Sequence, residues 1–421
     1  MFQIPRGTRD FTPEQMHKHQ TTLNNIRTTF HLFSYEEIQT PTFENLELFT
    51  AKSGDSIIEE LYNFTDKGGR ELALRPELTA PVMRFYIEQL QMLPKPLKLF
   101  YTGNCFRYDR PQKGRYREFW QAGCELIGPN TPEAHAELIA LAYTIFQHLK
   151  LENIVVNIGN LTIINALFTK LDITDEQKTH LLPLIDKEMF EDLYTALIDF
   201  NKTEQQAHHF ITLLETTDKK TLQDALTKHP EALQQLEHTS TLLTFLQDNF
   251  NIKKCQLKLS IVRGLEYYHG MVFEIEAPQL GAEKQLCGGG VYELIKLFGG
   301  RETPTSGFAI GVDRTILAMD TENISQPPPQ PQAYIIPVNE TSLPQALTLA
   351  HTLRNHNITT DIDLLRRGVS KALKYANTKH YQYILILGPQ ELEQQSVTLR
   401  NMKTGKQELI PLNKIHTKIP T

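Results

Sequence analysis

Hydrophobic and polar residues alternate along two neighbouring stretches of the chain, residues 97–108 and 119–127. A period of two is typical of β-strands. The segment between the two stretches contains Pro111 and Gly114, which favour a turn. The pattern therefore predicts a long antiparallel hairpin. Its loop and the entrance to that loop are strongly basic, with Arg107, Arg110, Lys113, Arg115 and Arg117.

The second strand of this hairpin has two unlike faces. One face is apolar throughout and carries Trp120, Ala122, Cys124 and Leu126. The other face adds an amide and a carboxylate to apolar residues, in the order Phe119, Gln121, Gly123, Glu125 and Ile127. Because an unpartnered carboxylate is costly to bury, this face should form the floor of a polar pocket. The arginines alone would instead favour a surface hairpin whose charges are solvated.

Helical and strand-like patterns alternate before the hairpin. Apolar residues at helical spacing follow Thr12 and Pro13, which suit the cap and the first position of a helix that ends near His31. Residues 34–49 then have the pattern of a strand. Pro41 within them cannot donate a ladder hydrogen bond, so we expect it at an edge, a bulge or a subunit contact.

A stretch without glycine follows the hairpin. Between Gly159 and Gly264 the chain has no glycine and only two prolines, and it is rich in residues that favour helices. We therefore predict a cluster of helices inserted into a domain built on strands. The three glycines of residues 288–290 then separate a strand pattern from a helical one, which predicts a turn whose backbone could approach a ligand closely.

A second strand-to-helix transition lies at residues 307–314. Small residues predict a strand that ends at Gly311, and the first turn of the following helix holds Asp313 and Arg314. An acidic residue is favourable at a helix start, whereas an arginine there needs an anionic or aromatic partner.

Residues 323–332, with the sequence NISQPPPQPQ, form the clearest boundary in the chain, because such a segment cannot enter a helix or a central strand. Beyond it, alternating strand and helix patterns indicate a small α/β domain. The net charge of the chain is −6, yet residues 333–421 contain 11 Lys and Arg against six Asp and Glu. This basic end is the better candidate for a surface that faces RNA, and solubility is the alternative explanation.

The composition is that of an ordinary globular protein, with 421 residues, 40% hydrophobic and 22% charged. No apolar run approaches the roughly 20 residues that a membrane helix needs, and the first residues lack the apolar core of a signal peptide. The four cysteines show neither CxxC spacing nor nearby His pairs, so no zinc site or disulfide framework is predicted. We expect a cytoplasmic protein that does not contact membranes.

The hairpin sequence FRYDRPQKGRYREF resembles, nearly residue for residue, the second signature motif of class II aminoacyl-tRNA synthetases in the form found in histidyl-tRNA synthetases. Residues 12–49 resemble the first class II signature, and TPTSGFAIGVDR resembles the third. RGLEYY at residues 263–268 is similar to RGLDYY, an element that other class II enzymes lack, and CGGGVYEL is similar to CGGGRYDGL. The C-terminal pattern resembles the class II anticodon-binding domain, so the resemblance covers essentially the full length.

Single residues depart from the motifs of that family. Leu78 replaces the glycine usual in the RPE-x-T motif, Glu266 replaces an Asp, and Asp313 replaces the more frequent Glu. Val291 and Glu293 differ from the glycine-rich element, so that only its glycines and tyrosine are carried across.

The resemblance implies an α+β fold, in which a class II catalytic domain on an antiparallel sheet carries a helical insertion and is followed by a C-terminal α/β anticodon-binding domain. The expected boundaries are residues 1–160 and 256–322 for the catalytic domain, 161–255 for the insertion, 323–332 for the linker and 333–421 for the anticodon-binding domain. A homodimer is expected by the same analogy.

The resemblance also implies a histidine–tRNA ligase, which activates histidine with ATP and transfers it to the 3′ end of tRNA(His). Arg107 and Arg263 would be the catalytic cations at the α-phosphate, with Mg²⁺ on the β- and γ-phosphates and no protein side chain assigned to a metal. Histidine would be bound by Glu77, Thr79, Gln121, Glu125, Tyr267, Tyr268, Gly288, Gly289 and Tyr292. ATP would be bound by Arg107, Asp109, Arg115, Phe119 and Arg314. tRNA would be bound by Gln112, Lys113, Arg117, Arg366 and Arg367.

Simpler structural explanations exist for some of these residues. Glu77 and Thr79 also fit the ordinary chemistry of a helix start. Arg263 interrupts an apolar run, and a salt bridge to Glu266 or Glu274 would satisfy it as well as a phosphate.

Two other functions are compatible with the same fold. One is a catalytically inactive, histidyl-tRNA synthetase-like regulatory subunit of ATP phosphoribosyltransferase in histidine biosynthesis. The other is a non-enzymatic relative that binds RNA or a partner. The regulatory subunit is disfavoured by the presence together of Arg107, Arg263 and Arg314 and by the C-terminal domain.

Overall fold

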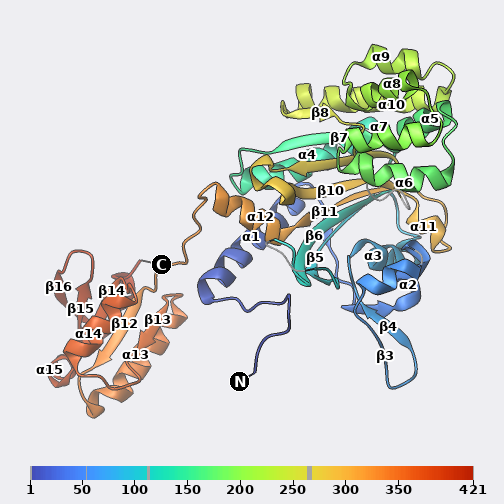
Figure 1. The fold of residues 1–421 in the computed structure, drawn as a ribbon. Coiled ribbons are helices and arrows are strands. Elements are labelled where there is room, and N and C mark those ends of the chain that lie inside the picture. Colours follow the sequence, from blue (N-terminus) through green and yellow to red (C-terminus); the bar gives the residue numbers. More distant parts are fainter. Residues whose placement is uncertain (1, 54, 111–113, 263–267, 421) are drawn as a thin grey trace. The chain divides into compact units, whose positions relative to one another are not determined.

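The computed structural model of the protein describes residues 2–53, 55–110, 114–262 and 268–420. The chain divides into two units, Met1–Gln326 and Pro327–Thr421. In the described part of the first unit, eight strands form one sheet in the order β1-β5-β6-β11-β10-β9-β7-β8 (Figure 1). These strands are β1 (Glu36–Glu37), β5 (Leu97–Phe106), β6 (Glu118–Ile127), β7 (Val155–Asn160), β8 (Cys255–Leu257), β9 (Tyr268–Glu276), β10 (Gln285–Tyr292) and β11 (Thr305–Gly311).

The centre of this sheet is antiparallel, and only the two outermost pairs, β1 with β5 and β7 with β8, run parallel. Strands β5 and β6 are the predicted hairpin, and their register places Gln121 opposite Gly103 and Glu125 opposite Leu99. Ala122 and Cys124 are buried on the apolar face. The predicted hairpin and its two faces are therefore confirmed.

Helices α1 (Pro13–Leu32), α4 (Pro132–His148) and α12 (Val312–Thr321) pack on the apolar face of the sheet and share one core with it. Thr12 caps α1 as predicted, because its hydroxyl accepts from the N–H of Gln15 while the Gln15 side chain accepts from the N–H of Thr12. The opposite face is covered in part by α3 (Thr79–Phe85), its continuation η2 (Tyr86–Leu90), and α11 (Leu294–Leu297).

The strand predicted over residues 34–49 is wrong in part. After β1, the chain forms β2 (Phe43–Asn45) and then helix α2 (Leu46–Ser53), which is followed by η1 (Asp55–Glu60). Leu46 and Phe49 are one helical turn apart and pack with Ala73, a contact that the local pattern does not reveal. β2 is the edge of a three-stranded sheet, β2-β4-β3, with β3 (Asn63–Thr65) and β4 (Glu71–Leu74). Pro41 thus lies between two edge strands, as its missing donor requires.

The predicted helical cluster is present between β7 and β8 and has its own core, seen at the top of Figure 1. Its elements are α5 (Leu161–Lys170), α6 (Asp175–Asp186), α7 (Phe190–Asp199), α8 (Glu204–Glu215), α9 (Lys219–Ala225), α10 (Pro230–Thr244) and η3 (Phe245–Asn249). None of the helices in the described ranges combines the length and the apolar sequence needed to span a membrane.

The turn predicted at residues 288–290 is wrong. The three glycines lie inside β10, which pairs with β9 on one side and β11 on the other. A Cβ atom on Gly289 would lie 2.3 Å from the main-chain oxygen of Gly307. Close approach of the neighbouring strands therefore explains this glycine, and Val291 belongs to the strand. The helix that follows, α11, has four residues.

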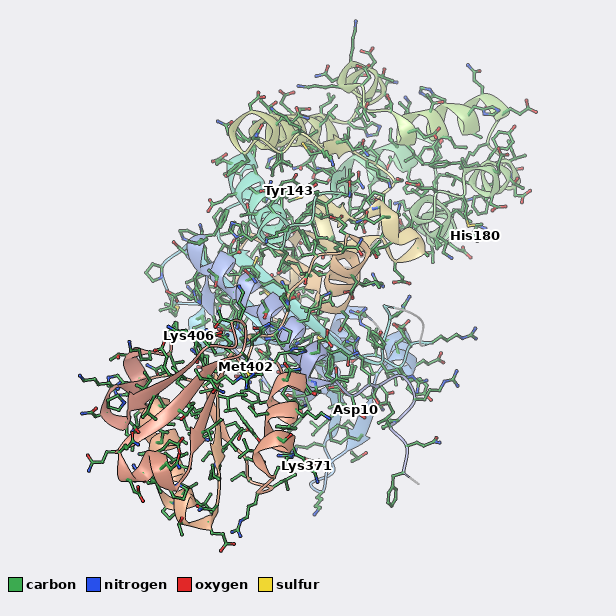
Figure 2. The ribbon with its side chains drawn as sticks, turned by 90° about the vertical axis from the view of Figure 1, so that its left-hand side faces the viewer. Asp10, Tyr143, His180, Lys371, Met402 and Lys406 are labelled. Carbon is green, nitrogen blue, oxygen red and sulfur yellow. The ribbon has the colours of Figure 1, made fainter. Side chains whose placement is uncertain are left out.

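The second unit contains a five-stranded sheet in the order β13-β12-β14-β15-β16. Its elements are β12 (Ala333–Pro337), η5 (Glu340–Ser342), α13 (Leu343–Asn355), β13 (Thr360–Ile362), α14 (Val369–Thr378), β14 (Tyr383–Leu387), α15 (Pro389–Glu393), β15 (Ser396–Asn401), β16 (Gln407–Pro411) and η6 (Leu412–Thr417). In Figure 2, Lys371 marks α14, and Met402 and Lys406 mark the turn of the final hairpin. The alternating pattern is confirmed, although α15 and η6 were not predicted.

Candidate active site

A cavity of about 410 Å³ lies on the polar face of the hairpin. Its walls come from the start of α3, from β6, β9, β10 and β11, and from the first turn of α12. All of the described residues predicted to bind histidine line this cavity except Glu125. These lining residues are Glu77, Thr79, Gln121, Tyr268, Gly288, Gly289 and Tyr292.

Glu125 is 1% exposed and has a partner that the sequence analysis missed. The hydroxyl of Tyr101 donates a hydrogen bond of 2.9 Å to Glu125 Oε1. Tyr101 faces Gly123 across the hairpin, and a Cβ atom on Gly123 would lie 2.7 Å from the Tyr101 oxygen. The register of the hairpin is therefore the signal that could have identified Tyr101. Burial, and then the charge of Glu125, raise the pKa of Tyr101 well above its usual value, so Tyr101 remains a donor.

Glu77 performs the helix-start role that its position suggested. Its carboxylate accepts hydrogen bonds from the backbone N–H groups of Thr79, at 2.6 Å, and Ala80, at 3.0 Å. The Thr79 hydroxyl lies 3.4 Å from the Tyr101 hydroxyl. The structural explanation for Glu77 is thus correct, and it leaves the carboxylate in the cavity wall. Leu78, at the position of the family glycine, has an ordinary φ of −112° and a buried side chain.

Arg107 is held at the cavity by its backbone and its side chain. Its backbone N–H donates to the main-chain oxygen of Arg117 at 2.9 Å, and its Nε donates to the main-chain oxygen of Pro76 at 2.9 Å. The guanidinium lies 5.3 Å from the centroid of the Phe119 ring. Gln121, beyond Phe119 on β6, accepts a hydrogen bond from the thiol of Cys105 at 3.3 Å. Burial raises the pKa of that thiol to about 12, so Cys105 is a structural neighbour of the cavity and not a nucleophile.

Two arginines that line the cavity each have a carboxylate partner. Arg115 pairs with Asp109 at 2.8 Å, and Arg314 pairs with Glu283 at 2.7 Å. Glu283 is the anionic partner expected for an arginine in the first turn of a helix, although the sequence analysis did not name it. Arginines and Phe119 in the wall of one cavity suit a nucleotide, since phosphates can replace the carboxylates and an aromatic ring can stack on a base.

Four of the predicted site residues, Arg263, Tyr267, Gln112 and Lys113, lie outside the described residues. Arg117 is described and is not among the residues that line the cavity. Arg117 places its guanidinium 3.9 Å from the centroid of the Tyr108 ring, and Tyr108 is 53% exposed.

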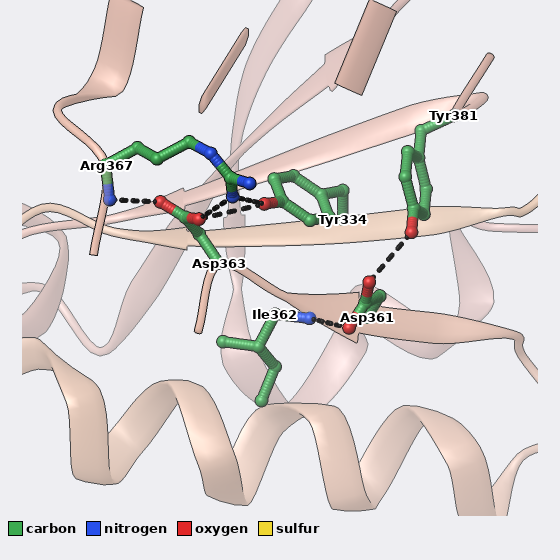
Figure 3. A network of polar contacts seen from close by, with 6 residues as sticks. All are labelled: Tyr334, Asp361, Ile362, Asp363, Arg367 and Tyr381. Atoms are coloured by element: carbon green, nitrogen blue, oxygen red, sulfur yellow. Dashed lines mark hydrogen bonds and ion pairs between the residues drawn. The ribbon is translucent and has the colours of Figure 1, made fainter. Parts of the chain in front are cut away.

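The two arginines predicted to bind tRNA in the second unit have different surroundings. Arg366 is exposed and pairs with Glu340 at 2.6 Å. Arg367 pairs with Asp363, which is 1% exposed, and also donates to the Tyr334 hydroxyl at 3.3 Å (Figure 3). Arg367 therefore holds the loop after β13 together and is partly exposed, whereas the side chain of Arg366 is mostly exposed.

Comparison with known proteins gives consistent matches over the chain. Residues 7–315 match the family model for histidyl-tRNA synthetase, and residues 332–421 match the model for an anticodon-binding domain. The histidine–tRNA ligase of Methanosarcina acetivorans is 43% identical over 415 residues, which cover 99% of this chain and 98% of the relative. That of Methanocaldococcus jannaschii is 40% identical over 422 residues, with 99% of both chains covered.

Solved structures show the same similarity. The apo histidyl-tRNA synthetase of S. aureus aligns with a TM-score of 0.76 and 29% identity over 99% of both chains. A structure from Bacillus halodurans, described as an ATP phosphoribosyltransferase regulatory subunit/histidyl-tRNA synthetase, aligns with a TM-score of 0.78 and 25% identity over 92% of this chain and 98% of that one.

Proposed function

This chain belongs to the histidyl-tRNA synthetase family, and from that membership we propose that it activates histidine with ATP, releases pyrophosphate, and transfers the histidyl group to the 3′ end of tRNA(His). The observation that carries the proposal is that one cavity is lined both by the described residues predicted to bind histidine, except Glu125, and by those predicted to bind ATP. The polar residues among them suit an amino acid with a polar side chain, and the arginines and Phe119 suit a nucleotide.

Glu125 and Tyr268 would recognise the imidazole ring of histidine. Such a polar pocket rejects analogues that lack a ring nitrogen, because its buried groups would then be left unpaired. Glu77, Thr79 and Gln121 would bind the α-amino group, which needs an anionic and hydrogen-bonding partner. The hydrogen bond from Tyr101 fixes Glu125 before histidine arrives.

Activation requires the histidine carboxylate to attack the α-phosphate of ATP. Because the two groups repel each other, cations must offset both their approach and the charge of the transition state. Arg107, fixed by its bond to the Pro76 oxygen, would act on one side, and Arg263 would act on the other. Arg115 and Arg314 would hold the nucleotide, and Phe119 would stack on adenine. Mg²⁺ would enter with ATP, because it commonly keeps phosphates and waters as ligands.

Transfer to tRNA requires surfaces outside this cavity. Gln112, Lys113 and Arg117 of the hairpin would contact the acceptor end, and Arg366 and Arg367 would contribute to anticodon binding. For the transfer step itself we assign no protein base, since a substrate phosphate oxygen can accept the proton. We further propose the domain boundaries expected above, a homodimer, and a cytoplasmic location.

The regulatory-subunit alternative is not favoured. The relatives named as histidine–tRNA ligases match over essentially the full chain, and the anticodon-binding domain is present.

The test is ATP–pyrophosphate exchange with each amino acid in turn and without tRNA. Exchange that depends on histidine alone would support both the reaction and the assignment of the pocket. No exchange with any amino acid, from folded protein, would favour the regulatory function. Exchange with another amino acid would contradict the roles of Glu125 and Tyr268.

A further inference from the structure

The segment that precedes α1 packs against the hairpin beside Tyr116, which lines the cavity. The N–H of Arg117, at the end of the hairpin loop, donates to the main-chain oxygen of Gly7 at 2.9 Å. Phe11 contacts the buried ring of His19, which in turn lies edge-on to Trp120 at 5.0 Å between centroids. Residues 7–11 are therefore attached to the start of β6 at two points.

Arg9 occupies the space between these two attachments. Its guanidinium lies 3.8 Å from the centroid of the Tyr116 ring and 4.6 Å from that of Phe11. It also forms an ion pair with Asp313, whose side chain is 4% exposed. The second carboxylate oxygen of Asp313 accepts from the N–H of Trp120 at 2.9 Å. Arg9 thus connects the hairpin to the first turn of α12.

The groups that Arg9 contacts are neighbours of the predicted nucleotide ligands. Tyr116 follows Arg115 in the chain, and Asp313 precedes Arg314. All four of these residues line the cavity. The separation between the two phosphate-binding arginines therefore depends on how the hairpin and α12 are held together.

We propose that Arg9 is a positioning residue for ATP, which holds Tyr116 and Asp313 together and thereby sets the distance between Arg115 and Arg314. This inference rests on the proposed function, because it concerns the nucleotide site of the same reaction. Arg9 does not itself contact the reacting atoms. Burial lowers the pKa of Arg9, although the guanidinium remains charged at neutral pH, so the ion pair with Asp313 is present under assay conditions.

The experiment compares Arg9→Ala and Arg9→Gln with Arg9→Lys in histidine-dependent pyrophosphate exchange. Misplacement of binding groups by a remote change can cost up to about 100-fold, and we expect a rise of roughly tenfold in the KM for ATP for Ala and Gln. The KM for histidine should stay within about twofold, because Arg9 contacts Phe11, Tyr116 and Asp313, none of which is assigned to histidine. Arg9→Lys retains the charge and should recover most of the ATP affinity.

Lys18→Ala is the matched control, because Lys18 also forms an ion pair between the N-terminal part of the chain and α12, but with Asp320 near the end of that helix. Its ATP KM should equal that of the parent. An unchanged ATP KM in Arg9→Gln, or an equal rise in the KM for histidine, would overturn the inference. Direct calorimetric titration measures the ATP affinity of the parent and of the Arg9 variants, and so tests this inference without the exchange reaction. Failure of the proposed function would instead show as a parent protein without histidine-dependent exchange.

Discussion

Replacement of Tyr101 by Phe removes one hydroxyl group from behind the histidine pocket and leaves the ring in place. That hydroxyl donates to Glu125 Oε1 at 2.9 Å, and both side chains are at most 2% exposed. A hydrogen bond to a charged group contributes about 1.5–3 kcal/mol. Because about 1.4 kcal/mol corresponds to a factor of ten in an equilibrium constant, we expect the KM for histidine to rise roughly 10- to 100-fold.

The assay is pyrophosphate exchange over a range of histidine concentrations at saturating ATP, repeated with ATP varied. The KM for ATP should stay near that of the parent, because the hydroxyl contacts Glu125 and Thr79, which are assigned to histidine. Tyr35→Phe is the control, since Tyr35 is also buried but belongs to the core on the opposite face of the sheet. A histidine KM within twofold of the parent in Tyr101→Phe would refute the idea that Tyr101 orients Glu125.

Three further predictions concern packing, pH and the second unit. Gly289→Ala should lower the free energy of unfolding by about 1–3 kcal/mol, because its Cβ would lie 2.3 Å from a main-chain oxygen of β11. Thermal unfolding measures this loss, and Gly368→Ala is the control, since a Cβ there would meet nothing within 4 Å. Burial lowers the pKa of His135 to about 3, so between about pH 6.5 and 3 the unfolded state binds a proton that the folded state does not. The free energy of unfolding should therefore fall as the pH drops through this range, and urea unfolding of His135→Leu should show a weaker pH dependence. Arg366→Ala should reduce aminoacylation without changing pyrophosphate exchange. Arg367→Ala should also lower the melting temperature, because it removes the ion-pair partner of the buried carboxylate of Asp363; equal melting temperatures of the two variants would contradict this distinction.

The local elements of the fold followed from local patterns. The hairpin was predicted because alternation and turn residues lie within one stretch of chain. Helix α1 was predicted because the capping partners of Thr12 are three residues away. The helical cluster was predicted from its lack of glycine. Where an element depends on partners elsewhere, the same patterns misled, as in the helix over Leu46–Ser53 and the glycines inside β10.

The candidate site was predicted unevenly for a similar reason. Gln121 and Glu125 were placed on the cavity side by a period of two, without knowledge of any other strand. Tyr101 was missed because it becomes a partner of Glu125 only through the register of the hairpin. Glu283 was missed because it lies in the connection between β9 and β10, whereas its partner Arg314 lies in α12.

By itself the sequence therefore determined the order of the elements, the apolar and polar faces of the central hairpin, and the motifs that resemble a family. Only the tertiary structure decided which groups share one cavity and which carboxylate each arginine meets. Arg9 and Asp313 are 304 positions apart in the chain, and nothing in the pattern around either residue indicates the other. Periodicity and capping depend on residues a few positions apart, whereas a site is assembled by the packing of strands and helices that are distant in sequence.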